Sequence, residues 1–128
     1  MDTNWLDGAL KAHPGVTKDY KAEWGWERYM VGGKMFAATC CPGPEHALPY
    51  AGHPLLNLKC DPLESELLRA QYPDILPGFY SDKRNWISIR LDGGVPQPLI
   101  HDLCDKSYAL ICQKLTKKLQ REIESAQG

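Results

Sequence analysis

The chain has 128 residues, of which 43% are hydrophobic and 24% charged, and its formal net charge is −1. This length suits one domain with a single core, and the near-neutral charge argues against a protein that binds polyanions over its whole surface. No apolar segment approaches the roughly 20 residues of a membrane span, and the N-terminus lacks the features of a signal peptide. We therefore expect one domain over residues 1–128, in the cytoplasm and without membrane contact.

The N-terminal third is predicted to form a helix and then a β-hairpin. Apolar residues at helical spacing place a short helix at about residues 3–12, and His13-Pro14-Gly15 ends it because proline disfavours a helical predecessor. A polar and aromatic connection is expected over residues 17–26. In the segment E27RYMVGGKMFAATC40, two strand-like runs flank Gly32-Gly33, a two-residue link that suits the turn of a hairpin.

The middle of the chain is predicted to contain a loop, a strand and a helix. Four prolines and two glycines in residues 42–54 indicate a loop, and residues 55–60 alternate as a third strand. The sequence Asp61-Pro62-Leu63-Glu64 is typical of a helix start, because aspartate can cap, proline suits the first turn and glutamate can reach back. This helix is expected to run to about Tyr72 and to end at Pro73.

The last third adds another strand and two helices. A loop through Pro77-Gly78 leads to the strand W86ISIRL91, apolar spacing predicts a helix over residues 98–115, and Thr116 can cap a final helical segment over residues 117–125. We expect the overall order of elements α-β-β-β-α-β-β-α. It predicts an α+β domain in which an antiparallel sheet is covered by helices.

The strand at residues 86–91 raises the first functional hypothesis. Ile87, Ile89 and Leu91 point one way and belong to a core, so the polar positions of this strand point the other way. If the strand at residues 55–60 lies in the same sheet, its polar positions share that side. This expected sheet face comprises Asn57, Lys59, Trp86, Ser88 and Arg90, with Tyr80, Lys83 and Arg84 at its rim. Basic and aromatic groups together suit nucleic acid, and they equally suit a peptide or a small anion. The alternative is a Trp86 that packs beneath the 42–54 loop.

Basic residues are also concentrated toward the C-terminus. Residues 83–121 contain eight basic and three acidic residues, although acids from elsewhere can lie beside these bases in the fold. One helical face would carry Lys114, Lys117, Lys118 and Arg121 if the helix is continuous there. Such a row can contact phosphates without reading sequence. It can equally be a solvated face that complements the negative end of the helix dipole.

Motifs of catalysis and of metal binding are absent from the sequence. There is no phosphate loop, dinucleotide fingerprint or nucleophile elbow. A metal set could include Cys40, Cys41, His46 and His53, but this spacing matches no zinc ribbon or finger. An odd count of five cysteines without an export signal predicts reduced thiols. We expect no enzyme activity, no metal and no cofactor.

Several short motifs, taken in order, resemble one family. They are V31GGKMFA37, L56NLKCDP62, Q71YP73, K83RNW86, S107Y108 and L115TKKL119. Over roughly residues 5–121 the chain resembles the MmcQ/YjbR proteins. The resemblance implies a frataxin-like (CyaY-like) α+β fold and a small bacterial cytosolic protein without established enzyme activity. The family is usually labelled DNA-binding from a proposed double-wing arrangement, a label that rests on fold analogy.

The chain departs from that family in the segment that contains K83RNW86. The usual pattern is similar to H-x-N-K-R-H-W, whereas Tyr80, Asp82 and Asn85 stand here at the histidine and asparagine positions. Loss of both histidines weakens any metal or acid–base role, and Asp82 adds a negative charge beside the Lys-Arg pair. The loop at residues 42–54 is also longer than the family suggests.

Two hypotheses follow. The first is a non-enzymatic, monomeric domain that binds DNA weakly and in a salt-dependent way through the C-terminal basic row and the Trp86 face. The second is a protein–protein or small-ligand adaptor that uses the same face, with Tyr80 and Trp86 as anchors.

Overall fold

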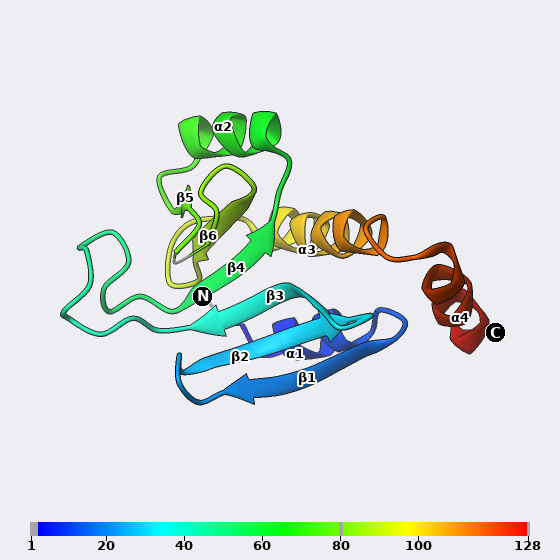
Figure 1. Ribbon diagram of the computed structural model, residues 1–128. Coiled ribbons are helices and arrows are strands. Elements are labelled where there is room, and N and C mark those ends of the chain that lie inside the picture. The colour runs from blue at the N-terminus through cyan, green and yellow to red at the C-terminus, as the bar shows by residue number, and fades with distance from the viewer. Residues whose placement is uncertain (1–2, 80, 128) are drawn as a thin grey trace.

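The computed structural model describes residues 3–79 and 81–127 and contains six strands and four helices within them (Figure 1). In chain order these are α1 (Asn4–Lys11), β1 (Val16–Lys21), β2 (Trp26–Val31), β3 (Lys34–Cys40), β4 (Leu55–Lys59), α2 (Pro62–Gln71), β5 (Ile75–Pro77), β6 (Trp86–Arg90), α3 (Gln97–Cys112) and α4 (Lys117–Gln127). None of these helices is long and apolar enough to cross a membrane.

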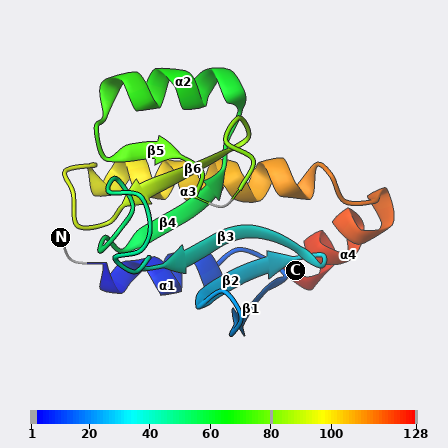
Figure 2. The ribbon, with the colours of Figure 1, turned by 60° about the vertical axis from the view of Figure 1, so that its left-hand side comes forward.

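The strands form one antiparallel sheet in the order β1-β2-β3-β4-β6-β5. Helices α1 and α3 lie on one face of this sheet, while α2 packs along the β5–β6 edge (Figure 2). The predicted α+β class and the antiparallel sheet with covering helices are therefore confirmed.

The main core lies between the sheet and helices α1 and α3. Leu58 and Ile87 are paired across β4 and β6 and are fully buried, as are Leu10 of α1 and Ile100 of α3. The alternation in residues 86–91 thus gives the predicted core positions. Helix α2 begins as predicted, since the Asp61 carboxylate accepts hydrogen bonds from the N–H groups of residues 63 and 64.

The hairpin between β2 and β3 turns at Gly32 and Gly33, as predicted. Both have positive φ, 58° and 79°, which is the conformation of a primed turn and favours glycine. A Cβ added at Gly32 would lie 2.7 Å from both methyl groups of Leu115. The turn therefore packs against the segment that joins α3 to α4.

The sequence analysis did not locate two of the strands. Residues 16–21 form the edge strand β1 instead of a connection, and Ile75–Pro77 forms the short strand β5. Strand β1 is largely exposed on both faces, so it lacks the alternation by which a half-buried strand is recognised. Its pairing with β2 is supported by the ion pair of Asp19 with Arg28.

The predicted helix over residues 98–115 is wrong at its C-terminal end. Helix α3 stops at Cys112, and tight i to i−3 hydrogen bonds at Lys114 and Leu115 turn the chain, which buries Leu115. Helix α4 then begins at Lys117, where the Thr116 hydroxyl accepts a hydrogen bond from the N–H of Leu119 (3.2 Å). The capped final helix is confirmed, and it is a separate element.

Candidate functional site

The centre of the predicted sheet face is buried. Asn57 and Ser88, predicted as ligand contacts, are opposite each other on β4 and β6 and are 0% exposed. The Ser88 hydroxyl donates to the Asn57 amide oxygen and accepts from the N–H of Phe79 (2.8 Å). Leu55 and Phe79 cover them in a second apolar cluster. Both polar side chains therefore join strands to the loop before β6, and neither can meet a ligand.

One end of the same face is open and positively charged. Lys59 is opposite Trp86 in the sheet, and its ammonium nitrogen lies 5.9 Å from the centre of the indole ring. Partial burial lowers the pKa of Lys59, and the neighbouring Lys114 ammonium lowers that pKa further. We refer to Lys59, Trp86 and Lys114 as the lysine–tryptophan cluster. The predicted alternative for Trp86 does not hold, because the 42–54 loop packs through Tyr50 on Phe79 instead.

Hydrogen bonds between a serine side chain and the backbone fix the position of Lys59. Tyr29 pairs with Ala37 and Met30 with Met35, so Phe36 is the extra residue of a β-bulge in β3. The buried Ser107 hydroxyl of α3 donates to the Phe36 carbonyl (2.5 Å) and accepts from the N–H of Lys59 (2.9 Å). One serine therefore ties α3 to β3 and β4 at the point where Lys59 leaves the sheet.

The loop before β6 carries two further bases of the prediction. The Lys83 ammonium donates to the Gly78 carbonyl (3.0 Å) and lies 5.5 Å from the Tyr50 ring centre, so it is partly committed to the fold. The Arg84 side chain is exposed, while Asp82 accepts hydrogen bonds from the Arg84 N–H and the Asn85 amide. Tyr80, predicted at the rim, lies outside the described residues.

Arg90 does not belong to the site. Its guanidinium forms an ion pair with Asp74 (2.8 Å) and donates to the carbonyls of Pro73 and Pro49. A neutralised guanidinium with carbonyl partners holds loops together and has little charge left for a ligand. The prediction of Arg90 as a nucleic-acid contact is therefore corrected by the structure.

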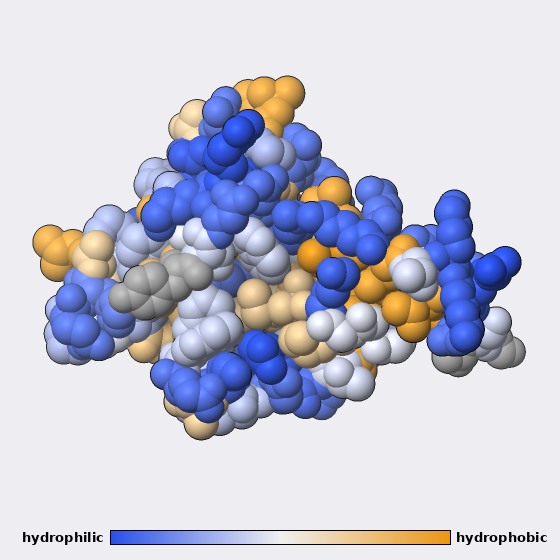
Figure 3. Space-filling model, in the orientation of Figure 1, coloured by the Kyte–Doolittle hydropathy of each residue, from blue (hydrophilic) through white to orange (hydrophobic). Residues whose placement is uncertain are grey.

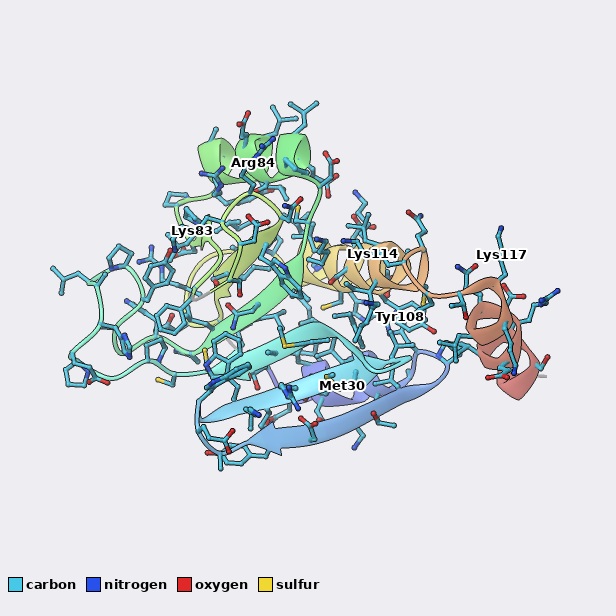
Figure 4. The ribbon with its side chains drawn as sticks, in the orientation of Figure 1. Met30, Lys83, Arg84, Tyr108, Lys114 and Lys117 are labelled. Carbon is cyan, nitrogen blue, oxygen red and sulfur yellow. The ribbon has the colours of Figure 1, made fainter. Side chains whose placement is uncertain are left out.

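The C-terminal basic row is not one helical face. Lys114 precedes α4 and joins the lysine–tryptophan cluster, whereas Lys117, Lys118 and Arg121 lie on α4. Figure 4 shows Lys114 at the end of α3 and Lys117 at the start of α4, with the linker between them. The row is thus divided by the break between the two helices.

The charge asymmetry of the sequence survives folding. In the N-terminal half, the bases of α1, β1 and β2 are neutralised by ion pairs: Lys11 and Lys18 with Asp7, Lys21 with Glu23, and Arg28 with Asp19. Toward the C-terminus, Lys106 and Arg90 are paired. No ion pair within residues 3–79 and 81–127 involves Lys59, Lys83, Arg84, Lys114, Lys117, Lys118 or Arg121.

The surface shows how these groups are arranged. Hydrophilic residues gather over α2 and the loop before β6, and again over α4 (Figure 3). Paler and more hydrophobic residues lie between these two regions over the sheet (Figure 3). The exposed Arg84 belongs to the loop before β6, and the exposed Lys117 belongs to α4.

The opposite end of the same face holds an open cavity of about 810 Å³ that the sequence analysis did not identify. Its walls include Trp24, Trp26 and Phe79, with the carboxylates of Glu23 and Glu45. The sequence E23WGW26 was the available signal, because a tight turn between two tryptophans brings both rings together. The prediction of a connection over residues 17–26 lacks β1 and so does not bring these two rings together.

The possible metal set does not assemble. The part of the chain that the structure describes contains no group of three or more His, Cys, Asp or Glu side chains placed to hold an ion. His53 instead pairs with Asp92 (2.9 Å), and burial raises the pKa of the Cys40 thiol to about 11.

Comparison with known proteins places these features in a family context. The YjbR family model matches residues 11–110. Uncharacterized protein YbdF of Escherichia coli O157:H7 is 32% identical over 95 residues, which cover 74% of this chain and 71% of that protein. Uncharacterized protein YjbR of Escherichia coli K12 is 30% identical over 97 residues, covering 76% and 75%.

Solved structures agree with the fold. The crystal structure of Deinococcus radiodurans protein DR2400, with a DUF419 domain, superimposes with a TM-score of 0.78 at 28% identity and covers 93% of this chain and 85% of that chain. A Pseudomonas syringae protein with 22% identity shares the fold, with a TM-score of 0.72 over 86% of this chain and 98% of that chain. The family match includes Lys59 and Trp86, whereas Lys114 and α4 lie beyond its last residue.

Proposed function

This chain belongs to the YjbR family, and from that premise we propose that it is a non-enzymatic domain that binds DNA at the lysine–tryptophan cluster. The observation that carries the proposal is the position of Lys59, which lies beside the Trp86 ring and has Lys114 as a neighbour. Two adjacent ammonium groups repel each other, and a phosphate placed between them offsets that repulsion. The indole beside them offers a surface on which a base can stack.

The surrounding charges support a path for the DNA backbone. Arg84 lies in the loop before β6, and Lys117, Lys118 and Arg121 extend the unpaired charge onto α4. Contacts of this kind position a nucleic acid without reading its sequence. We therefore expect weak, sequence-tolerant binding that decreases steeply with salt, and a preference for DNA with unpaired bases because only those can stack on Trp86.

The chemistry of the cluster favours binding over catalysis. Ammonium and indole groups bind anions and bases. The nearby Asp82 is held in its turn by Asn85 and by the N–H of Arg84.

The test is binding of labelled single-stranded and duplex DNA by fluorescence anisotropy between about 20 and 200 mM salt. The double variant Lys59→Ala/Lys114→Ala should weaken binding at least tenfold and lower the slope of log K against log salt by about 1 to 2. Lys106→Ala is the matched control, because Lys106 is already neutralised by Glu64 and Asp102. Equal losses in both variants would sink the proposal.

The alternative is an adaptor that binds a protein through Trp86. It predicts that Trp86→Ala weakens partner binding more than Lys59→Ala/Lys114→Ala does. The reason is that a buried aromatic anchor dominates a protein interface, whereas rim charges contribute little. If Trp86→Ala abolishes partner binding while DNA binding is absent at low salt, the adaptor is the better account.

A further inference from the structure

The cavity at the other end of the sheet lies between the β1–β2 turn, the end of β3 and the first part of the 42–54 loop. These three segments lie at the left of Figure 1. Its volume of about 810 Å³ is within the range of small-molecule sites, roughly 300–1,000 Å³. The proposed DNA surface does not use it, because the buried Asn57–Ser88 pair separates the two ends of the face.

Aromatic rings form the inner wall of this cavity. The Trp24 and Trp26 rings meet edge to face at 5.5 Å between centres, and Trp26 lies 6.3 Å from Phe79. His46 packs edge-on against Phe79 at 5.1 Å. Trp26 and Phe79 are buried, whereas Trp24 is 55% exposed at the mouth. A large exposed indole at the entrance to an aromatic pocket is typical of a ligand site.

The charge of the cavity selects the kind of ligand. Glu23 and Glu45 line it, and none of its lining residues within the described ranges is a lysine or an arginine. Lys21 and Arg28 lie against the Trp24 ring, at 5.3 and 5.9 Å from its centre. Each of these two bases forms an ion pair, Lys21 with Glu23 at 3.0 Å and Arg28 with Asp19 at 2.7 Å. Their charges are therefore neutralised and would attract a bound anion only weakly.

We propose that this cavity binds a small organic cation with a substituted ammonium group. The exposed Trp24 ring would attract the cation through its quadrupole, and Glu45 would supply the opposite charge. A Glu45 carboxylate oxygen lies 3.3 Å from His46 Nε2, and the Glu45 side chain is 70% exposed, so it can turn toward a bound cation. A hydrophobic or aromatic body on the ligand would fill the remaining space against Phe79 and Pro42.

The four tryptophans make the proposal directly testable by NMR. In a ¹⁵N-labelled sample, each indole N–H gives one resonance, and single Trp→Phe variants assign them. Benzyltrimethylammonium and choline are the cationic probes, and 3,3-dimethylbutanol is the neutral analogue of choline. Both cations should shift the indoles of Trp24 and Trp26 and leave those of Trp5 and Trp86 in place, and the neutral analogue should bind about tenfold more weakly.

Variants separate charge from shape. Trp24→Ala and Glu45→Gln alter exposed groups, so the fold should persist, and each should weaken cation binding several-fold. Glu66→Gln is the control, because Glu66 is exposed on α2, away from the cavity. Equal binding of choline and its neutral analogue, or no shift at either cavity indole up to about 20 mM of both cations, would overturn the proposal.

Discussion

The two ends of one sheet face both contain tryptophan, but they differ in charge and in their contact with the 42–54 loop. At the lysine–tryptophan cluster, Trp86 lies beside Lys59, and Lys59 neighbours Lys114. Neither lysine forms an ion pair with a carboxylate among the described residues. At the aromatic cavity, Trp24 and Trp26 lie beside Glu23 and Glu45. The two ends are only four residues apart along β4, from Leu55 to Lys59.

The long 42–54 loop explains the difference. It folds back over one end, where the Tyr50 ring packs on Phe79 and its hydroxyl donates to the Pro77 carbonyl (2.8 Å). The loop leaves the Lys59 end uncovered. One sheet face thus carries an acidic cavity at the end where the loop forms a wall and a basic surface at the end that the loop does not reach.

The boundary between the two ends should be the most sensitive position. Replacing Asn57 by Ala leaves the buried Ser88 hydroxyl without its acceptor, and we expect a loss of about 2–3 kcal/mol in the free energy of unfolding. Urea denaturation measures this. The exposed Ser125→Ala should stay within about 0.5 kcal/mol of the parent. An Asn57→Ala protein as stable as the parent would show that this pair does not join the two ends.

The basic end should be sensitive to alkaline pH. Because burial and Lys114 lower the pKa of Lys59, this lysine loses its charge at a lower pH than an ordinary lysine. DNA affinity should therefore decrease as pH rises from neutrality toward the usual lysine range of about 10.4, and it should decrease later in Lys59→Arg. Anisotropy titrations at several pH values measure this. Identical pH profiles in the two proteins would contradict a role for Lys59.

The same lysine should make the folded protein more stable as pH rises, whereas DNA affinity decreases. The fold disfavours charged Lys59, so its unfavourable contribution is fully present below the folded pKa and decreases as pH rises from there to the ordinary lysine pKa. Lys59→Met should therefore be at least as stable as the parent while it binds DNA more weakly. Thermal unfolding at pH 7 checks this, and a clear destabilisation would mean that Lys59 has a structural role.

The thiols at the acidic end should show the smallest effect. Burial raises the pKa of Cys40 to about 11, so little thiolate forms there at pH 8, whereas Cys41 is exposed. Iodoacetamide should modify Cys41 well before Cys40, as peptide mass spectrometry can show. Similar rates at the two cysteines would mean that this end of the face is more open than the structure indicates.

Sequence reasoning succeeded where the signal was local. Gly32-Gly33 specified its turn, Asp61 its helix start, and the alternation of Ile87 and Ile89 a core strand. It failed where a distant segment decides burial. Asn57 and Ser88 are polar and alternate correctly, yet only the course of the chain through Phe79 shows that they are covered.

The two functional ends differ in the same way. Lys59 and Trp86 could be predicted as neighbours, because each stands on the polar side of a strand and the strands pair. Lys114 joined them unexpectedly, since the break after α3 moves it off the α4 face. The aromatic cavity requires a strand, a turn and a long loop to meet, and β1 carries too little alternation to be recognised.

The most direct test of the account follows all four tryptophan indoles in one NMR titration with short single-stranded DNA at low salt. The account predicts that DNA shifts the Trp86 resonance, leaves those of Trp24 and Trp26 unchanged, and loses this effect in Lys59→Ala/Lys114→Ala. Shifts confined to Trp24 and Trp26, or no shift at Trp86 at any DNA concentration, would contradict the assignment of the basic end as the DNA-binding surface.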